Sequence, residues 1–543
     1  MATQGTQFET VALPKRLPLV IQPENREEST DKDAKLINGY MERSPEGEEY
    51  WVYKRPGLAA AVSGSAVVSG IGRGVYNWQG YVFTVFGGNL YYYASFPATA
   101  APTLAGAVND DGTYKFSSTL GSVPKLQLSN GRYMYNYDFT GGLIPVLGEN
   151  TLVTAGAFQV DYTYEIAVVG TTDFTLIGAA SNTPGVHFVA TGAGTGTGTA
   201  YLNSNFPNNA QLVPGIAYLD GTTYVLDKQA YIHGSDSPAG LNVPDQWSDL
   251  TNLLGAQIEP DAGVCIAKQL VYVLALKQWS TEVFYNAGNP PGASPLAPVQ
   301  GAKMNFGCVT ADSLQDIDGA LLWVATNRGS AVQIIMVDNL KPVVVSTKAI
   351  ERLLSEASFA SGNVASMGIK YEGHRFYVLT LKSDNLTLVY DLTDKLWSQW
   401  TDTDGNYFKG VANTFYNVLR LVQHETNGMI YFMGSEYYTD AGAVITTDLY
   451  TPNFDGGVRR RKHLNVMEFI GDQTEGSTLQ VRVNDADYAS TKWSSFRLVD
   501  MSVPKPVLIN CGTFMRRAVH IRHQSPTRMR LQAIELQLDV GTL

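Results

Sequence analysis

Carboxylate and imidazole side chains are the first candidates for chemistry in this sequence, because they act as acids, bases and metal ligands. Asp485 and Asp487 lie two residues apart and share one face of a strand, but no third or fourth oxygen ligand for a cation follows them. His520 and His523 lie three apart, so on a strand they point to opposite faces. We interpret the aspartates as a solvated hairpin tip and predict no metal site at either pair.

Catalytic constellations of other kinds are also missing. The seven histidines show no spacing that pairs them with a Ser or Cys nucleophile, and the acidic residues are too scattered to nominate a glycosidase pair. The glycine-rich stretch 192–198 lacks the Gly-Lys-Ser/Thr of a phosphate loop. Residues 313–323, SLQDIDGALLW, lack the spacing of an Asp-box, so we interpret them as a plain turn. The sequence therefore predicts no catalytic residue, no cofactor and no enzyme.

A short basic run is the strongest candidate for binding a partner. It consists of Arg459, Arg460, Arg461 and Lys462. Aromatic residues do not interleave with it, which argues against a nucleic-acid site and favours contact with an acidic partner or a solvated linker between domains. Further arginines belong to the same end of the chain: Arg516, Arg517, Arg522, Arg528 and Arg530.

The charge of the chain is unevenly distributed. The net charge is −11, which argues against a general nucleic-acid coat. Residues 452–543 nevertheless hold 13 Lys and Arg against 9 Asp and Glu, while the rest of the chain holds 26 against 41. An acidic body with a basic end indicates either a dedicated docking surface or ordinary surface variation.

The three cysteines, Cys265, Cys308 and Cys511, lie far apart in strand-like runs, so we predict buried thiols and not a disulfide framework. The first ten residues, MATQGTQFET, lack the basic and then apolar pattern of a signal peptide. No run of about eighteen apolar residues occurs that would predict a membrane-spanning helix. We therefore expect a protein that is made and used without signal-dependent export.

The elements that would position these residues are mostly short strands. The stretch 368–400 divides into four runs rich in aromatic or aliphatic residues, separated by turn residues such as Glu372-Gly373. Four antiparallel strands on tight turns in about thirty residues is the size of one propeller blade. Such a sheet needs neighbours of its own kind to cover its faces.

Similar strand clusters recur along the chain and predict about seven degenerate blades, with six or eight as alternatives. Each combines a tight turn with an aromatic strand, and the propeller signatures of the WD40 and kelch types are missing. The clusters occupy residues 72–93, 125–146, 215–233, 263–285, 308–345, 368–400 and 409–438.

The fold class is therefore all-β, a β-propeller with a small inserted β-domain and a C-terminal β-sandwich. The insertion contains expected strands at 164–169, 174–177 and 187–190, and one amphipathic helix is expected at Thr347–Ala357. Six or more strands after residue 445 predict the sandwich. The predicted domains are an extended arm at 1–55, a propeller at 56–148 and 206–444, the insertion at 149–205 and the sandwich at 445–543.

Several short motifs resemble those of a known family. Asn38-Gly39-Tyr40, Lys54–Leu58 and Gly72–Tyr76 resemble the opening of the tail-hub, or nozzle, proteins of short-tailed bacteriophages, which are also described as packaged-DNA stabilisation or head-completion proteins. Residues 345–351, 373–378 and 391–397 are similar to elements late in that family's propeller, and the last hundred residues, with Trp493, to its C-terminal β-domain. The insertion resembles a small β-module of phage structural proteins.

The resemblance implies a structural virion protein in the phage tail, assembled in the bacterial host cytoplasm. It implies a ring of identical subunits, six in number, below the portal and adaptor, which extends the DNA ejection channel, retains the packaged DNA and anchors tail fibres or spikes. The acidic body agrees with a channel that does not grip DNA, because like charges repel.

A carbohydrate-binding or carbohydrate-active propeller used in host-surface recognition is the alternative. It rests on tyrosines whose faces could stack on a sugar, among them Tyr91, Tyr92, Tyr93, Tyr437 and Tyr438.

Overall fold

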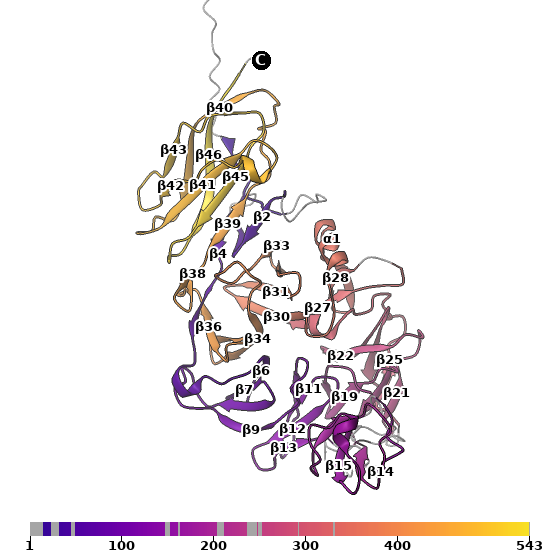
Figure 1. The fold of residues 1–543 in the computed structure, drawn as a ribbon. Coiled ribbons are helices and arrows are strands. Elements are labelled where there is room, and N and C mark those ends of the chain that lie inside the picture. Colours follow the sequence, from indigo (N-terminus) through magenta and orange to yellow (C-terminus); the bar gives the residue numbers. More distant parts are fainter. Residues whose placement is uncertain are drawn as a thin grey trace, which may run out of the picture. The chain divides into compact units, whose positions relative to one another are not determined.

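Most of the chain consists of antiparallel β-sheets of four or more strands (Figure 1). A computed structural model describes residues 15–22, 32–44, 49–146, 152–160, 163–202, 211–235, 247, 252–290, 293–329 and 332–541. The chain divides into two compact units. One holds Ser63–Val344 with Glu425–Gly428, and the other holds Met1–Val62, Val345–His424 and Met429–Leu543.

The unit built on Ser63–Val344 contains five sheets of four strands in which neighbouring strands follow one another along the chain, as in propeller blades. The first sheet contains β6 (Gly72–Trp78), β7 (Tyr81–Phe86), β8 (Asn89–Tyr93) and β9 (Thr103–Ala107). The second contains β10 (Lys115–Ser118), β11 (Leu126–Ser129), β12 (Met134–Asp138) and β13 (Gly142–Pro145). The third is β18 (Ala217–Leu219), β19 (Thr222–Leu226), β20 (Tyr231–Gly234), β21 (Leu253–Gly255). The fourth contains β22 (Gly263–Gln269), β23 (Tyr272–Lys277), β24 (Thr281–Asn286) and β25 (Leu296–Pro298). The fifth contains β26 (Gln315–Ile317), β27 (Ala320–Ala325), β28 (Gln333–Asp338) and β29 (Lys341–Val344).

The other unit contains two further sheets of the same kind, so the described residues hold seven. The sixth is β30 (Val364–Tyr371), β31 (His374–Leu381), β32 (Leu386–Asp391), β33 (Leu396–Gln399). The seventh is β34 (Gly410–Tyr416), β35 (Leu419–His424), β36 (Ile430–Gly434) and, from the other end of the chain, β5 (Gly57–Ala60). The two-stranded hairpin β37 (Thr439–Asp440) and β38 (Ala443–Val444) continues beyond β5. The predicted all-β propeller of about seven blades is confirmed.

Tight hairpin turns join the strands, as the sequence indicates. Both central residues take positive φ at Asp220-Gly221, Asp318-Gly319 and Glu372-Gly373, which is the conformation of type I′ turns. A Cβ placed on Gly221 or Gly373 would meet no atom within 4 Å, so these positions favour glycine for its backbone freedom and not for space.

The inserted segment forms its own sheet in the order β14 (Leu152–Thr154), β17 (Thr199–Leu202), β15 (Thr163–Val168) and β16 (His187–Val189). Its core contains Phe158, Tyr164, Phe174 and Phe188. The strand expected at 174–177 is wrong. Phe174–Ile177 is instead a 3₁₀ turn, because the Asp173 side chain accepts from the Thr175 N–H at its start and Gly178 takes a left-handed conformation at its end.

C-terminal strands form a sandwich together with strands from the start of the chain (Figure 1). One sheet runs β3 (Gly39–Arg43), β4 (Tyr50–Lys54), β46 (Arg530–Val540), β40 (Lys462–Gly471), β43 (Val507–Ile509). In the same sheet β1 (Lys15–Arg16) pairs with β46, and β44 (Thr513–Phe514) pairs with β40. The other extends the sixth blade from β33 through β2 (Lys35–Ile37), β39 (Thr447–Tyr450), β45 (Ala518–His523), β41 (Thr478–Asn484) and β42 (Arg497–Asp500). One apolar core between them includes Met41, Phe469, Val481 and Ile534.

The remaining elements are short helices. The predicted helix is confirmed as α1 (Lys348–Glu356), with Thr347 at its N-cap and buried Ile350 and Leu354 on one face. In the described part of the chain the 3₁₀ turns besides 174–177 are Gly64–Ala66, Ala311–Ser313 and Ser490–Lys492. Among the described residues, no helix has the length and apolar character needed to cross a membrane. The division into four domains, including the arm at 1–55, stays a prediction.

Candidate functional site

The predicted docking run at residues 459–462 divides into exposed and buried side chains. Arg459, Arg460 and Arg461 are exposed, whereas Lys462, the first residue of β40, is 1% exposed. The Lys462 ammonium donates to the backbone oxygens of Val458, of Arg460 at 2.9 Å and of Met515 at 3.0 Å. Lys462 therefore holds the loop in place, and the three arginines are the part of the run that a partner can reach.

The other arginines of the basic end are paired with aspartates. Arg517 binds Asp485 at 2.7 Å and Arg516 binds Asp487 at 3.2 Å, so the two aspartates considered as cation ligands serve separate ion pairs. Arg522 binds Asp448 at 2.7 Å, and Arg528 and Arg530 both bind Asp472. Among the described residues no carboxylate lies within ion-pair distance of Arg459, Arg460 or Arg461, so these three neighbouring charges are not neutralised within the described chain.

Two of the motifs behind the family resemblance meet at Arg55, whose side chain is fully buried. Its Nε donates to Asn38 Oδ1 at 2.9 Å, its Nη2 to the Thr401 carbonyl at 3.0 Å and its two terminal nitrogens to the Asp440 carboxylate. Nη1 also donates to the Pro56 carbonyl at 3.0 Å. One guanidinium thus ties the first strands to residues that follow the sixth blade and to the hairpin beside the seventh.

Glycines in the same motifs allow close backbone contacts. A Cβ on Gly57 would lie 2.4 Å from the Thr439 carbonyl oxygen, and one on Gly39 would lie 2.7 Å from that of Tyr53. Neither neighbour is the end of a flexible side chain, so any larger residue would force the backbones apart. The contacts of Arg55 with Asn38, Thr401 and Asp440 form what we call the Arg55 joint. Packing at this joint explains why the motif residues are needed.

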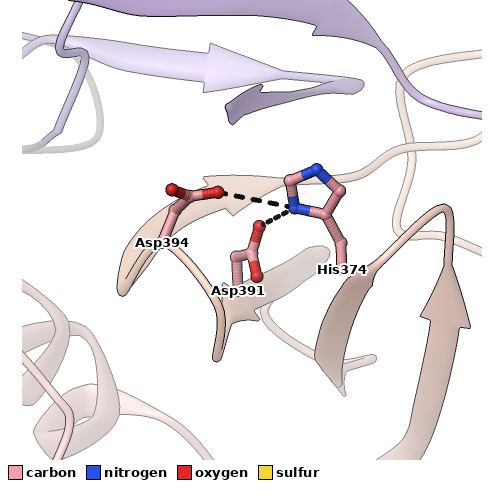
Figure 2. Close-up of side chains that lie close together, drawn as sticks. All are labelled: His374, Asp391 and Asp394. Carbon is pink, nitrogen blue, oxygen red and sulfur yellow. Dashed lines mark hydrogen bonds and ion pairs between the residues drawn. The ribbon is translucent and has the colours of Figure 1, made fainter. Parts of the chain in front are cut away.

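Beside the joint lies a cluster of ionisable groups, which we call the His374 corner (Figure 2). It consists of His374 at the start of β31, Asp391 at the end of β32 and Asp394 in the following turn. Figure 2 shows His374 Nδ1 facing both carboxylates, 2.6 Å from Asp391 Oδ2 and 3.6 Å from Asp394 Oδ2. The three side chains are 6%, 6% and 12% exposed.

Antiparallel pairing explains why these residues meet. Phe376 on β31 pairs with Asp391 on β32, so His374, two residues before Phe376, lies beside the turn that carries Asp394. The imidazole stacks on Phe376 with ring centroids 5.6 Å apart, and the Tyr40 ring lies 4.9 Å away. The aromatic neighbours fix the ring orientation and keep water from one side of the corner.

Charges in the His374 corner shift its pKa values. Burial lowers the pKa of His374, but the hydrogen bond and charge of Asp391, with the charge of Asp394, outweigh burial and raise it. Burial and the neighbouring Asp391 charge also raise the pKa of Asp394. The corner therefore favours a positive charge between two carboxylates.

A second buried His–Asp pair in the same sheet has different neighbours, and we call it the His520 corner. His520 Nε2 lies 2.7 Å from Asp448 Oδ1, while its Nδ1 accepts from Arg482 Nε at 2.8 Å. Arg522 Nε also donates to Asp448, at 2.7 Å. An imidazole that accepts at Nδ1 is neutral, and burial is the main reason why the pKa of His520 is lowered. His523 bonds separately, to Ser477 Oγ at 3.1 Å.

Sequence reasoning missed the His374 corner because its members belong to two turns 17 to 20 residues apart. A usable signal was present: the tight turn Glu372-Gly373 precedes His374, and the turn 393–395 lies at the same end of the hairpin. Strand pairing across β31 and β32 brings those two turns together. Residues 313–323 contain the tight turn of the β26–β27 hairpin, at which Asp316 accepts from the Gly319 N–H at 2.8 Å.

The tyrosines of the carbohydrate alternative have several environments. Tyr93 is buried, and Tyr92 packs against Phe83 and Tyr137 inside a blade cluster. Tyr437 and Tyr438 instead line a cavity of about 160 Å³ with Tyr40, Tyr53 and Tyr371. A separate cavity of about 290 Å³ is lined by Trp279, Glu259, Asp261, Ser280, Asn305, Asn327 and Arg328.

The cysteines remain free thiols. Cys265 and Cys308 are buried with their sulfurs 3.8 Å apart, and Cys511 is partly buried. The hydrogen bond that the Cys265 thiol donates to Cys308, together with burial, raises the pKa of Cys265, so the neutral form is favoured.

Comparison with known proteins finds a match to a family model over part of the chain. Residues 241–438 match a family model described as "Bacteriophage P22 Gp10, beta-propeller". No curated protein sequence matches the chain.

Solved propellers match at low similarity. The Pan2 WD40 domain of Neurospora crassa has 8% identity, covering 70% of this chain and 96% of that chain with a TM-score of 0.36. BamB of Moraxella catarrhalis has 10% identity, covering 78% and 98% with a TM-score of 0.33. The WD40 propeller domain of Doa1 has 8% identity, covering 70% and 97% with a TM-score of 0.33. Scores of this size carry no argument about the function of this chain.

Proposed function

We propose that this chain, whose residues 241–438 belong to the phage DNA-stabilisation family, forms a homo-oligomeric ring in the tail of a phage virion. The ring, a hexamer, extends the DNA ejection channel below the portal and adaptor, retains the packaged genome and anchors tail fibres or spikes. The family match is the observation that carries this proposal.

The charge distribution supports a conduit. A net charge of −11 disfavours adhesion of the phosphate backbone, so DNA can pass without being held. The exposed loop 459–461 is suited to an acidic surface of a neighbouring subunit or of the adaptor, because its arginines have no ion-pair partner among the described residues.

Particle mass is the first experiment. A monomer has a mass of 59.1 kDa, so a ring of six has a mass of about 350 kDa by light scattering. Imaging then tests for an open centre. A protein that stays monomeric at high concentration, and also with its adaptor ring present, would argue against the proposal.

The docking role of the loop has its own test. Replacing Arg459, Arg460 and Arg461 by Glu reverses the local charge and should weaken ring or adaptor assembly while the purified chain remains folded. Replacing the same residues by Lys keeps the charge and is the matched control. Unchanged assembly of the Glu variant would make the loop a linker only.

A carbohydrate-binding propeller for host recognition is the second candidate. The cavity beside Trp279 favours it, since an indole face with amide and carboxylate groups around it suits a sugar ring. Arg328 lies 5.4 Å from the Trp279 ring and covers part of that face. A glycan array with the wild-type protein and with Trp279→Ala tests it, and the absence of any signal from the wild-type protein would remove this candidate.

A further inference from the structure

We propose that the His374 corner binds one divalent first-row transition-metal ion of the zinc type, through His374 Nδ1 and one carboxylate oxygen each from Asp391 and Asp394. These three ligand atoms all lie within 4.8 Å of one another (Figure 2). Zinc bonds to nitrogen and oxygen are about 2.1 Å long, which puts ligand atoms of a tetrahedral site about 3.4 Å apart. Small side-chain rotations are therefore enough to surround an ion, and water supplies the fourth ligand.

Charge balance is the main argument for a cation. The corner brings together two carboxylates whose side chains are 6% and 12% exposed. In the described part of the chain no lysine or arginine lies within ion-pair distance of Asp391 or Asp394, and His374 is their only cationic neighbour. Buried carboxylates need a compensating charge, and a divalent ion supplies more than one imidazolium can.

The other two buried His–Asp pairs lack this combination. His520 and Asp448 share their site with Arg522, whose guanidinium already neutralises the carboxylate. His233 lies 2.9 Å from Asp227, and no second carboxylate joins that pair within ion-pair distance among the described residues. Within the described ranges, such a convergence of one nitrogen and two oxygens is therefore found at the His374 corner alone.

The ligand types select the class of metal. An imidazole with two carboxylates suits zinc, manganese or cobalt, whereas calcium prefers six to eight oxygens, which this corner does not offer. On binding, the ion replaces the proton at Nδ1, and that proton leaves to solvent.

The position of the corner indicates what the ion does. Asp394 accepts a hydrogen bond from the backbone N–H of Arg43 on β3, and the Tyr40 ring of the same strand packs on His374. An ion held by Asp394 and His374 would therefore fasten the β31–β32 hairpin to β3, beside the Arg55 joint. We infer a structural ion and not a catalytic one.

Calorimetric titration of the chelator-treated, tag-free protein with zinc chloride tests the proposal. We expect one ion per chain and a rise in melting temperature of roughly 5 °C at zinc concentrations near a hundred times the dissociation constant. Cobalt chloride should give visible absorption bands of a nitrogen- and oxygen-ligated site, which zinc displaces.

Matched variants separate this site from other histidines. Asp394→Asn keeps an oxygen for the Arg43 N–H and the shape of the side chain, so it should fold, and it should weaken zinc binding at least about tenfold. His374→Gln should weaken it further. His233→Gln alters the pair without a second carboxylate and should leave zinc binding unchanged. No binding up to about 100 µM zinc, or equal binding by wild type and Asp394→Asn, would overturn the proposal.

Discussion

His374 and His520 belong to the same nine-stranded sheet, and each ring contacts one buried aspartate, at 2.6 Å in the His374 corner and 2.7 Å in the His520 corner. Their surroundings differ in the sign of the nearest additional charge. A second carboxylate, Asp394, faces His374, whereas two guanidiniums, of Arg482 and Arg522, surround the His520 pair.

The difference teaches that a His–Asp contact does not by itself determine the protonation state. In the His374 corner the pKa of the imidazole is raised against the effect of burial, while in the His520 corner burial prevails and the pKa is lowered. The first pair stabilises a cation, and the second is a neutral ring in a network whose positive charge belongs to arginine.

Removing the charge of Asp448 should have the largest effect on stability. In Asp448→Asn, Arg522 and His520 lose the carboxylate that accepts from both, so we expect the free energy of unfolding to fall by about 2–3 kcal/mol. Urea unfolding at pH 7.5 measures the loss.

The control for that substitution is Asp404→Asn, at an exposed position, which should change stability by less than about 0.5 kcal/mol. If Asp448→Asn were equally mild, the His520 corner would not be a stabilising network, and the contrast between the two corners would be lost.

Acid should act through the histidines that are buried in neutral form. Burial, and then the charge of Lys54, lower the pKa of His523 to about 3, and the pKa of His520 is also lowered. Their unfolded-state pKa is about 6.5, so the unfolded chain takes up more protons below that pH and stability is lost as the pH falls. At pH 5.5 we expect His523 to cost about 1.4 kcal/mol relative to pH 7.5, and His520 to act in the same direction.

Urea midpoints at pH 7.5, 6.5 and 5.5 check this for the wild type and for His523→Gln, whose dependence on pH should be weaker. His374 works in the opposite direction, because its raised pKa stabilises the fold below about 6.5 and that contribution disappears as the pH rises through the folded-state value. An unchanged pH dependence in His523→Gln would show that this ring does not titrate on unfolding.

Asp394→Asn should have a smaller effect of the opposite sign. Burial and the Asp391 charge raise the pKa of Asp394, so its carboxylate is less stable in the fold than in the unfolded chain. In the presence of a chelator we expect the neutral amide to raise stability by less than about 1 kcal/mol, measured by thermal unfolding. A clear loss of stability in the metal-free protein would mean that the Asp394 charge helps the corner even without an ion.

Arg482→Met should have the smallest effect, confined to titration of one ring. The charge of Arg482 helps to lower the pKa of His520, so removing it should move that pKa upward, toward the usual value. Nuclear magnetic resonance of the chain with isotope-labelled histidine follows the imidazole signals. His374 on β31 is the internal control, and its pKa should stay above the usual value.

The blades could be predicted from the sequence because their signals are local. Turn residues such as Asp220-Gly221 and Glu372-Gly373 stand next to alternating aromatic strands, and the pairing that they specify occurs within a few residues. The helix from Lys348 could be predicted for the same reason, since its N-cap and its apolar face are adjacent in the chain.

The joints could not be predicted, because their partners are hundreds of residues apart. Nothing near Arg55 in the sequence indicates that Asp440 neutralises it, and nothing near Lys35–Ile37 indicates pairing with β39 in the C-terminal sandwich. Periodicity identifies a strand but not its neighbour. The exposure of Arg459–Arg461 agrees with a docking surface, while the burial of Lys462 depends on the Met515 carbonyl, which no local pattern reveals.

Strand β5 has a consequence for the order in which the protein can mature. Residues 57–60 leave the ribosome early, yet their partner β36, at 430–434, is made about 370 residues later, which takes roughly 20 to 75 seconds at bacterial synthesis rates. Until then the nascent chain carries an apolar segment with unpaired backbone groups. The seventh blade can therefore close only late in synthesis, after β36 has emerged, and in the interval before it a chaperone can protect the strand or a neighbouring nascent chain can capture it.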